Sequence, residues 1–172
     1  MTEKEQIERA TAEGFIPLYN KEMNASYMIA EYSDAPDVRC VDAQGNKLNL
    51  ELTLTEDRPG DIQARLGRSN DRGLEALRAH VEKVRTGKAD AIERVSSLNG
   101  NVAEVVLTRI QAKMNKRYGL NSALVVRDTS GVDWDWSLII QDLCNRLKGI
   151  PNPFDKGIWI LSCSKDRIFR VV

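Results

Sequence analysis

The sequence predicts an α/β fold, in which helices flank a small mixed β-sheet to give a three-layer sandwich. Two kinds of pattern support this. Residues 36–56 and 122–127 look like strands, whereas residues 102–118 and 133–148 carry apolar side chains at helical spacing. Because these patterns alternate along only 172 residues, we expect a single domain that spans residues 1–172.

Two helices are expected before the first strand. Thr2 and the glutamate three residues later match a capping box that opens a short helix ending at Gly14. Pro17 blocks continuation of that helix. A second helix is expected from about Asn20, ending before Asp34-Ala35-Pro36, since the residue preceding a proline avoids helical angles.

Residues 36–56 have the pattern of a β-hairpin. The second arm alternates apolar with polar residues, and its apolar face is made by Leu48, Leu50, Leu52 and Leu54. The three residues that end at Gly45 fit a hairpin loop whose last residue takes the left-handed backbone conformation. Pairing Asp42 with Asn46 across this loop sets the register of the two arms.

The rest of the chain alternates helices and strands. Further helices are expected at residues 61–68, 71–85, 102–118 and 133–148. Further strands are expected at residues 122–127, 158–163 and 168–172. The first of these strands has a continuous apolar run from Ala123 to Val126, as in a strand that is buried on both faces. Gly119 and Gly149 are placed to end the helices that precede them.

The hairpin register places Asp37 directly opposite Glu51. Two carboxylates that face each other across a strand pair repel, so a cation between them would stabilise the hairpin. Mg²⁺ and Mn²⁺ favour oxygen ligands and are often held by one or two carboxylates. Two alternatives stay open: one carboxylate is solvated, or Arg39 or Lys47 neutralises the pair.

Lys113 has an unusual place on the helix predicted at residues 102–118. On a helical wheel it falls within the apolar arc, and a buried ammonium is costly without an anionic partner. Lys113 therefore either extends to solvent or points at the pair formed by Asp37 and Glu51. Arg117 lies in the same arc and is a candidate phosphate ligand.

Two short motifs, Pro36-Asp37 and Leu50-Glu51-Leu52-Thr53, resemble the PD-(D/E)XK nuclease superfamily, whose fold is restriction-endonuclease-like. The resemblance covers roughly residues 20–127. The chain departs from the common pattern at Thr53, where the family carries a catalytic lysine. In branches with this departure a following helix often supplies the lysine, and Lys113 looks like that residue.

The resemblance implies a metal-dependent nuclease that hydrolyses phosphodiester bonds of nucleic acid. In this family pattern Asp37, Glu51 and the Leu52 carbonyl would hold one Mg²⁺ or Mn²⁺, which would acidify a water. Lys113 would orient that water or stabilise developing negative charge, and Thr53 would hydrogen-bond the water. A helix before the first strand can add a carboxylate in this family. Glu22 and Glu31 are candidates, although solvated glutamates are the more ordinary interpretation.

A basic segment of the chain is a candidate surface for nucleic acid. The chain has no net charge, but residues 58–88 hold 8 Lys/Arg and 4 Asp/Glu. We expect nucleic-acid contacts from Arg65, Arg68, Arg72, Lys116 and Arg117. The alternative is an ordinary solvated helix face, because acidic residues are interspersed. DNA is favoured over RNA as the partner, and a homodimer or another protein is expected to complete the groove.

Thr53 also keeps a second class of function open. Without the usual lysine, the domain would be a catalytically inactive nuclease fold that binds nucleic acid or protein. Three cysteines without metal-type spacing, and no apolar run long enough to cross a membrane, favour a cytoplasmic protein without a membrane partner.

Overall fold

The structure, a computed structural model, describes residues 3–55, 91–128, 134–162 and 167–172. Within these ranges three helices flank a six-stranded mixed β-sheet. The helices are α1 (Glu3–Met23), α3 (Ala91–Met114) and α4 (Trp136–Leu147). The strands are β1 (Met28–Tyr32), β2 (Val38–Val41), β3 (Lys47–Leu54), β4 (Ser122–Asp128), β5 (Ile158–Ser162) and β6 (Arg167–Arg170). The predicted α/β architecture is confirmed, whereas the helices predicted at residues 61–68 and 71–85 lie outside the described ranges.

The strands follow one another across the sheet in chain order, from β1 at one edge to β6 at the other. β3, β4 and β5 run parallel, and the pairs β1–β2, β2–β3 and β5–β6 are antiparallel. Parallel neighbours need a crossover connection, and α3 and α4 lie in the segments that precede β4 and β5. Strand β3 pairs with β2 on one side and with β4 on the other, so the β2–β3 hairpin borders the parallel part of the sheet.

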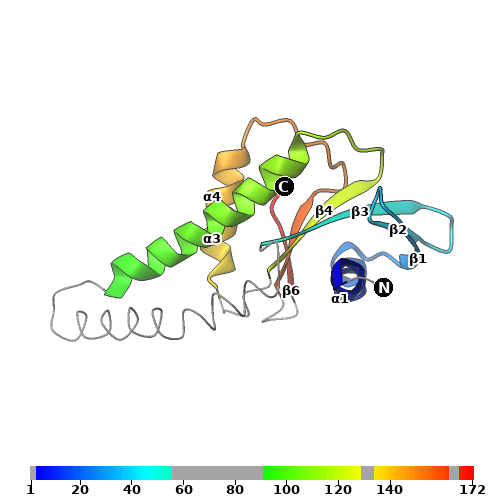
Figure 1. Ribbon diagram of the computed structural model, residues 1–172, viewed down its shortest axis with the longest axis horizontal. Helices are drawn as coiled ribbons and strands as arrows, with labels where there is room; N and C mark the ends of the chain where they lie inside the picture. Colours follow the sequence, from blue (N-terminus) through cyan, green and yellow to red (C-terminus); the bar gives the residue numbers. More distant parts are fainter. Residues whose placement is uncertain (1–2, 56–90, 129–133, 163–166) are drawn as a thin grey trace.

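Two apolar cores lie on opposite faces of the sheet, one beneath α1 and the other beneath α3 and α4 (Figure 1). Successive residues of β4 enter the two cores alternately. Ala123 and Val125 face α1, whereas Leu124 and Val126 face α3 and α4, and all four are fully buried. This confirms the prediction that residues 122–127 form a strand buried on both faces.

The N-terminal segment differs from its prediction, because one helix, α1, runs through both Gly14 and Pro17. Proline inside a helix costs about 3 kcal/mol. Pro17 lies on the exposed side of α1, where water can satisfy the carbonyl that loses its partner. The other side buries Phe15 and Tyr19 against the sheet, and burial at about 1.5–3 kcal/mol per large side chain outweighs that cost.

Strand β1 replaces the second predicted helix. Asn24, just after α1, has a left-handed backbone with φ 49°, which ends the helical path. The side chain of Asn20 then binds both polar backbone groups of Tyr27: Nδ2 donates to the carbonyl at 2.8 Å, and Oδ1 accepts from the N–H at 2.9 Å. These contacts extend the chain at the start of β1, and pairing with β2 completes the strand. Local spacing did not reveal this long-range pairing.

The hairpin of β2 and β3 is confirmed with the predicted register. The paired residues include Val38 with Leu50 and Cys40 with Leu48. The N–H of Asp42 donates to the carbonyl of Asn46 at 3.1 Å, and Gly45 has the expected positive φ of 83°. The carboxylate of Asp42 also accepts hydrogen bonds from Asn46, which lower the pKa of this exposed group.

α3 begins and ends earlier than predicted. Tyr118 therefore lies beyond the helix, in the loop at residues 115–121 that leads to β4. The end of this loop is fixed by the carboxylate of Asp155, which accepts hydrogen bonds from the N–H groups of Asn121 and Ser122 at 3.0 and 2.8 Å. The C-terminal elements α4, β5 and β6 occupy about the predicted positions.

Candidate active site

Asp37 lies just before β2 and, when the register of the hairpin is continued, opposite Glu51. Its carboxylate accepts a hydrogen bond from the backbone N–H of Leu52 at 2.6 Å. The same register places Pro36 opposite Leu52, and proline has no N–H to donate to the Leu52 carbonyl. In an extended strand the N–H and the C=O of one residue point to the same side. The Leu52 carbonyl therefore faces the side of β3 on which Asp37 lies, as the Leu52 N–H does.

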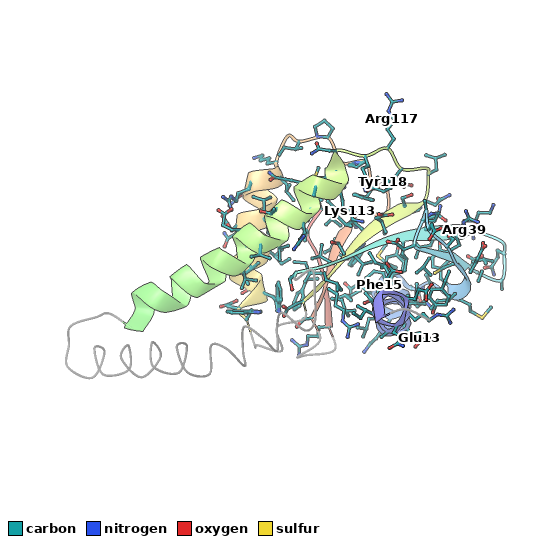
Figure 2. All side chains as sticks on the ribbon, in the orientation of Figure 1. Glu13, Phe15, Arg39, Lys113, Arg117 and Tyr118 are labelled. Carbon is teal, nitrogen blue, oxygen red and sulfur yellow. The ribbon has the colours of Figure 1, made fainter. Side chains whose placement is uncertain are left out.

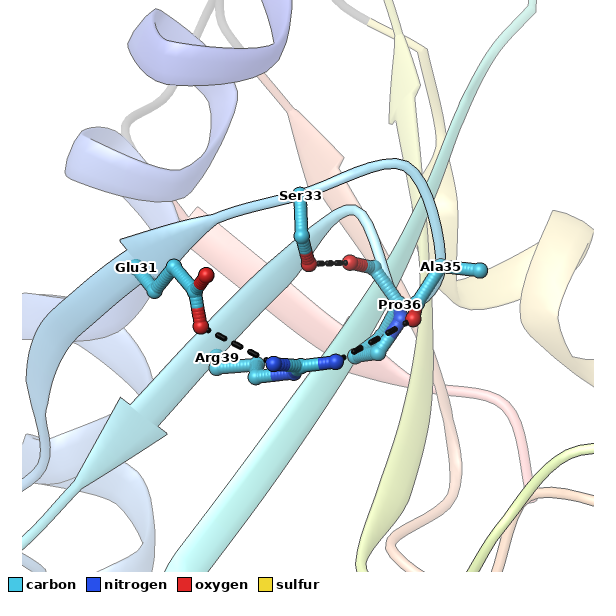
Figure 3. Close-up of polar contacts among 5 residues, drawn as sticks. All are labelled: Glu31, Ser33, Ala35, Pro36 and Arg39. Atoms are coloured by element: carbon cyan, nitrogen blue, oxygen red, sulfur yellow. Dashed lines mark hydrogen bonds and ion pairs between the residues drawn. The ribbon is translucent and has the colours of Figure 1, made fainter.

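The loop before Asp37 is held by its own polar contacts (Figure 3). The hydroxyl of Ser33 donates to the carbonyl of Pro36. The backbone N–H of Ser33 donates to the carbonyl of Asp37 at 3.0 Å. These contacts fix the direction of the backbone where the chain enters β2, and so they position the Asp37 side chain.

Arg39 has partners other than the carboxylate pair. It forms an ion pair with Glu31 at 2.9 Å and also donates to the carbonyl of Ala35 (Figure 3). Both partners of the ion pair are about half exposed, at 48% and 56%. The alternative in which Arg39 neutralises Asp37 and Glu51 is therefore wrong.

The cation beside the carboxylates is Lys113, from the last turn of α3. Its Nζ donates to Oε1 of Glu51 at 2.6 Å, and the two side chains are only 21% and 11% exposed. Glu51 faces α3 because it is in register with Leu124, which packs in the core beneath that helix. Lys47, the other cation considered, is exposed at the start of β3. The structure thus brings together the carboxylates and the lysine that the sequence patterns selected.

Burial raises the pKa of Asp37 to about 6. The residue is only 8% exposed, and loss of hydration disfavours its charged form. The hydrogen bond from Leu52 and the charge of Lys113 lower the pKa, whereas repulsion from Glu51 and Glu8 raises it. A carboxylate held with a perturbed pKa beside specific charged partners is typical of a functional site.

Glu8 is a carboxylate near the site to which the sequence pattern did not point. It lies on α1, is half-buried, and is close enough to Asp37 to raise its pKa. The glutamates considered from the sequence lie elsewhere: Glu22 is exposed near the end of α1, and Glu31 pairs with Arg39. Selecting Glu8 would have required knowing that α1 continues past Gly14 and packs on the sheet.

Tyr118 is a second residue that the sequence pattern missed as part of the site. Its ring packs on Phe154, with ring centroids 4.4 Å apart. Burial, and after it the charges of Glu51 and Asp37, raise the pKa of Tyr118 to about 12. Tyr118 and Lys113 lie near each other, between the end of α3 and the sheet (Figure 2). The only signal in the sequence was the position of Tyr118 shortly after Lys113.

The other predicted residues have varied positions. Thr53 is half-buried and, by strand alternation, lies on the same face of β3 as Glu51. Lys116 and Arg117 are exposed in the loop after α3, where Arg117 points away from the body of the protein (Figure 2). The remaining predicted nucleic-acid contacts, which lie outside the described ranges, are Arg65, Arg68 and Arg72.

The chemistry of the donors fits a hard divalent cation. The hydrogen bonds described above use one oxygen of each carboxylate, Oδ2 of Asp37 and Oε1 of Glu51. The second oxygen of each, with the Leu52 carbonyl, matches the oxygen ligands that Mg²⁺ and Mn²⁺ prefer. Among the described residues no three His, Cys, Asp or Glu side chains gather closely enough to hold a metal alone. Mg²⁺ commonly completes such a shell with water or phosphate oxygens.

Comparison with known proteins found no relatives: no family model, curated protein or solved structure matches the chain. In the part of the chain that the structure describes, no helix has the length and apolar character needed to span a membrane. Function is therefore inferred from the arrangement of Asp37, Glu51 and Lys113.

Proposed function

We propose that this protein is a metal-dependent nuclease that hydrolyses phosphodiester bonds of nucleic acid, DNA in preference to RNA. One observation carries the proposal: Asp37, Glu51 and Lys113 meet from the start of β2, from β3 and from the end of α3. Two shielded carboxylates beside one ammonium are groups that metal-assisted phosphodiester hydrolysis uses. The same placement, on an antiparallel hairpin and a following helix, supports the restriction-endonuclease-like fold that the sequence motifs imply.

In this proposal Asp37, Glu51 and the carbonyl of Leu52 hold Mg²⁺ or Mn²⁺. A cation bound there would polarise a phosphoryl oxygen and lower the pKa of a nearby water. The raised pKa of Asp37 supports this assignment, because a divalent cation would offset both its lost hydration and its repulsion from Glu51.

Lys113 is placed to bind the reacting groups. Its ammonium has three N–H donors, one of which is directed at Glu51. Another can donate to the attacking water or to a phosphoryl oxygen, where negative charge develops as the reaction proceeds. In hydrolysis the water oxygen bonds to phosphorus and gives up a proton while the bond to the leaving oxygen breaks, and the leaving oxygen takes up a proton. Thr53, on the same face of β3 as Glu51, is placed to hydrogen-bond the water.

The loop at residues 115–121 offers a surface for an extended anionic substrate. Lys116 and Arg117 are exposed there, and Leu120 is 81% exposed. The side chain of Asn49 donates to the carbonyl of Leu120 at 3.1 Å, which ties the loop to the strand that carries Glu51. Cations so placed would give sequence-independent affinity for the phosphate backbone.

A second function, a catalytically inactive binding module, is favoured by one specific observation. Lys113 already neutralises one carboxylate of the pair, and Thr53 stands where the family pattern has lysine. A structural ion pair would account for both features without a metal. This candidate requires that nucleic-acid binding survive both chelation and the substitution Asp37→Ala.

A plasmid cleavage assay separates the two candidates. With Mg²⁺ or Mn²⁺ the wild type is expected to cleave, and a chelator is expected to abolish cleavage. Lys113→Met should lower the rate about 100-fold, the order of effect for removing a donor to developing charge. Lys47→Met is the matched control and should keep the activity, because Lys47 is exposed at the start of β3 and takes no part in the proposed site. DNA binding without cleavage, unchanged by the chelator, would favour the binding module.

A further inference from the structure

The hydroxyl of Tyr118 is buried and makes no hydrogen bond with any residue that the structure describes. A buried hydroxyl without an acceptor costs about 1–3 kcal/mol, so such groups usually have a partner in the functional state. The ring is held in place by Phe154, which is only 1% exposed, at a centroid distance of 4.4 Å and an interplanar angle of 34°. Rotation of the side chain towards water is therefore opposed by packing.

The surroundings of this hydroxyl restrict the kind of partner it can bind. Glu51 and Asp37 are close enough to raise the pKa of Tyr118, yet neither carboxylate accepts its hydrogen bond. Because burial raises the pKa to about 12, the hydroxyl stays protonated near neutral pH and can act as a donor. An oxygen atom that enters from outside, between Tyr118 and the carboxylates, would give this donor an acceptor.

We propose that Tyr118 binds the substrate by donating a hydrogen bond from its hydroxyl to a non-bridging oxygen of the phosphodiester. This inference rests on the proposed function. It extends that function to a residue that lies outside the hairpin motif and is not the lysine that α3 supplies. Lys113 at the end of α3 and Tyr118 in the loop beyond it lie near each other (Figure 2), an arrangement that suits two donors to one phosphate. A neutral donor adds to binding of the anion without competing with Lys113 for Glu51.

Isotope-edited NMR tests this contact without requiring cleavage. The protein is labelled at the ζ-carbon of tyrosine and titrated with a short single-stranded oligodeoxynucleotide in Ca²⁺, a hard cation that also takes oxygen ligands. The Tyr118 resonance should shift, whereas that of Tyr32, whose hydroxyl lies 3.5 Å from Glu13, should not. The substitution Tyr118→Phe assigns the signal. Oligonucleotide binding that leaves the Tyr118 signal unmoved would overturn the inference.

Kinetics give the second readout. Tyr118→Phe removes one oxygen and keeps the ring on Phe154, so folding should be unaffected or improved. Cleavage is expected to fall about 100-fold, with Mn²⁺ affinity unchanged, and Tyr32→Phe is expected to cleave like the wild type. Wild-type activity in Tyr118→Phe would overturn the inference while leaving the nuclease proposal standing. A Tyr118 shift in a protein that never cleaves would support the contact and contradict the nuclease proposal.

Discussion

Lys113 donates to Glu51 at 2.6 Å although 62 residues separate the two along the chain. The bond joins the last turn of α3 to the central part of the sheet. Both side chains are largely shielded from water, so each charge depends on the other for stabilisation. The pair is therefore both a structural contact and the main charged feature of the proposed site.

A double-mutant cycle should show this dependence. Lys113→Met alone leaves the shielded Glu51 carboxylate unpaired and is expected to lower the free energy of unfolding by about 3 kcal/mol. Glu51→Gln added to that variant should recover much of the loss, because the Glu51 charge that Lys113 stabilised is then absent as well. Chemical denaturation of the four proteins measures the coupling. Losses that simply add would mean that the two side chains do not depend on each other.

The raised pKa of Asp37 predicts how stability depends on pH. The folded protein binds this proton more tightly than the unfolded chain, since the pKa rises from 3.8 to about 6. The resulting stabilisation is complete below about pH 4 and is lost as the pH rises through 6, by about 3 kcal/mol in total. Urea unfolding of the wild type and Asp37→Asn from pH 4 to 7 isolates this change as the difference between them. A difference that is constant with pH would contradict the assigned pKa.

Glu8 should influence Asp37 through charge. Its repulsion contributes to the raised pKa of Asp37, so Glu8→Gln is expected to lower that pKa. NMR titration of the Asp37 side-chain carboxyl carbon measures the change. Glu13→Gln serves as a control, because Glu13 is exposed on the same helix. An Asp37 pKa that is equal in the Glu8→Gln variant and the wild type would remove Glu8 from the site.

Asp155 should support the loop that carries Tyr118. Its carboxylate accepts two backbone hydrogen bonds at the end of this loop, from Asn121 and Ser122. Asp155→Ala is expected to cost about 1 kcal/mol of unfolding free energy and to reduce cleavage by loosening the position of Tyr118. Asp155→Asn, which keeps an acceptor oxygen, should recover part of both. Thermal unfolding and plasmid cleavage provide the measurements, and full activity in Asp155→Ala would contradict this role.

The hairpin could be predicted from the sequence because its determinants are local. Alternation fixes which face each residue occupies, and the loop that ends at Gly45 fixes the register that brings Asp37 opposite Glu51. Lys113 could be selected because a lysine within an apolar arc needs a partner. These signals do not depend on knowing the rest of the fold.

The missed features depend on contacts between distant segments. β1 forms because it pairs with β2, and α1 passes through Pro17 because Phe15 and Tyr19 gain burial on the sheet. Glu8 and Tyr118 enter the site only because α1 and the loop after α3 are placed by such packing. The helical wheel for residues 102–118 put Arg117 in the apolar arc because the predicted helix end was too late. In the structure Arg117 lies beyond the end of α3 and is exposed.

The central claim is that Asp37 and Glu51 hold a divalent cation. Calorimetric titration of Mn²⁺ into the wild type, Asp37→Asn, Glu51→Gln and the control Glu31→Gln tests it most directly, because Glu31 is an exposed carboxylate paired with Arg39. We predict one site in the wild type and in Glu31→Gln, and loss of that site in the other two variants. Absence of Mn²⁺ binding to the wild type, or equal binding to all four proteins, would contradict the claim.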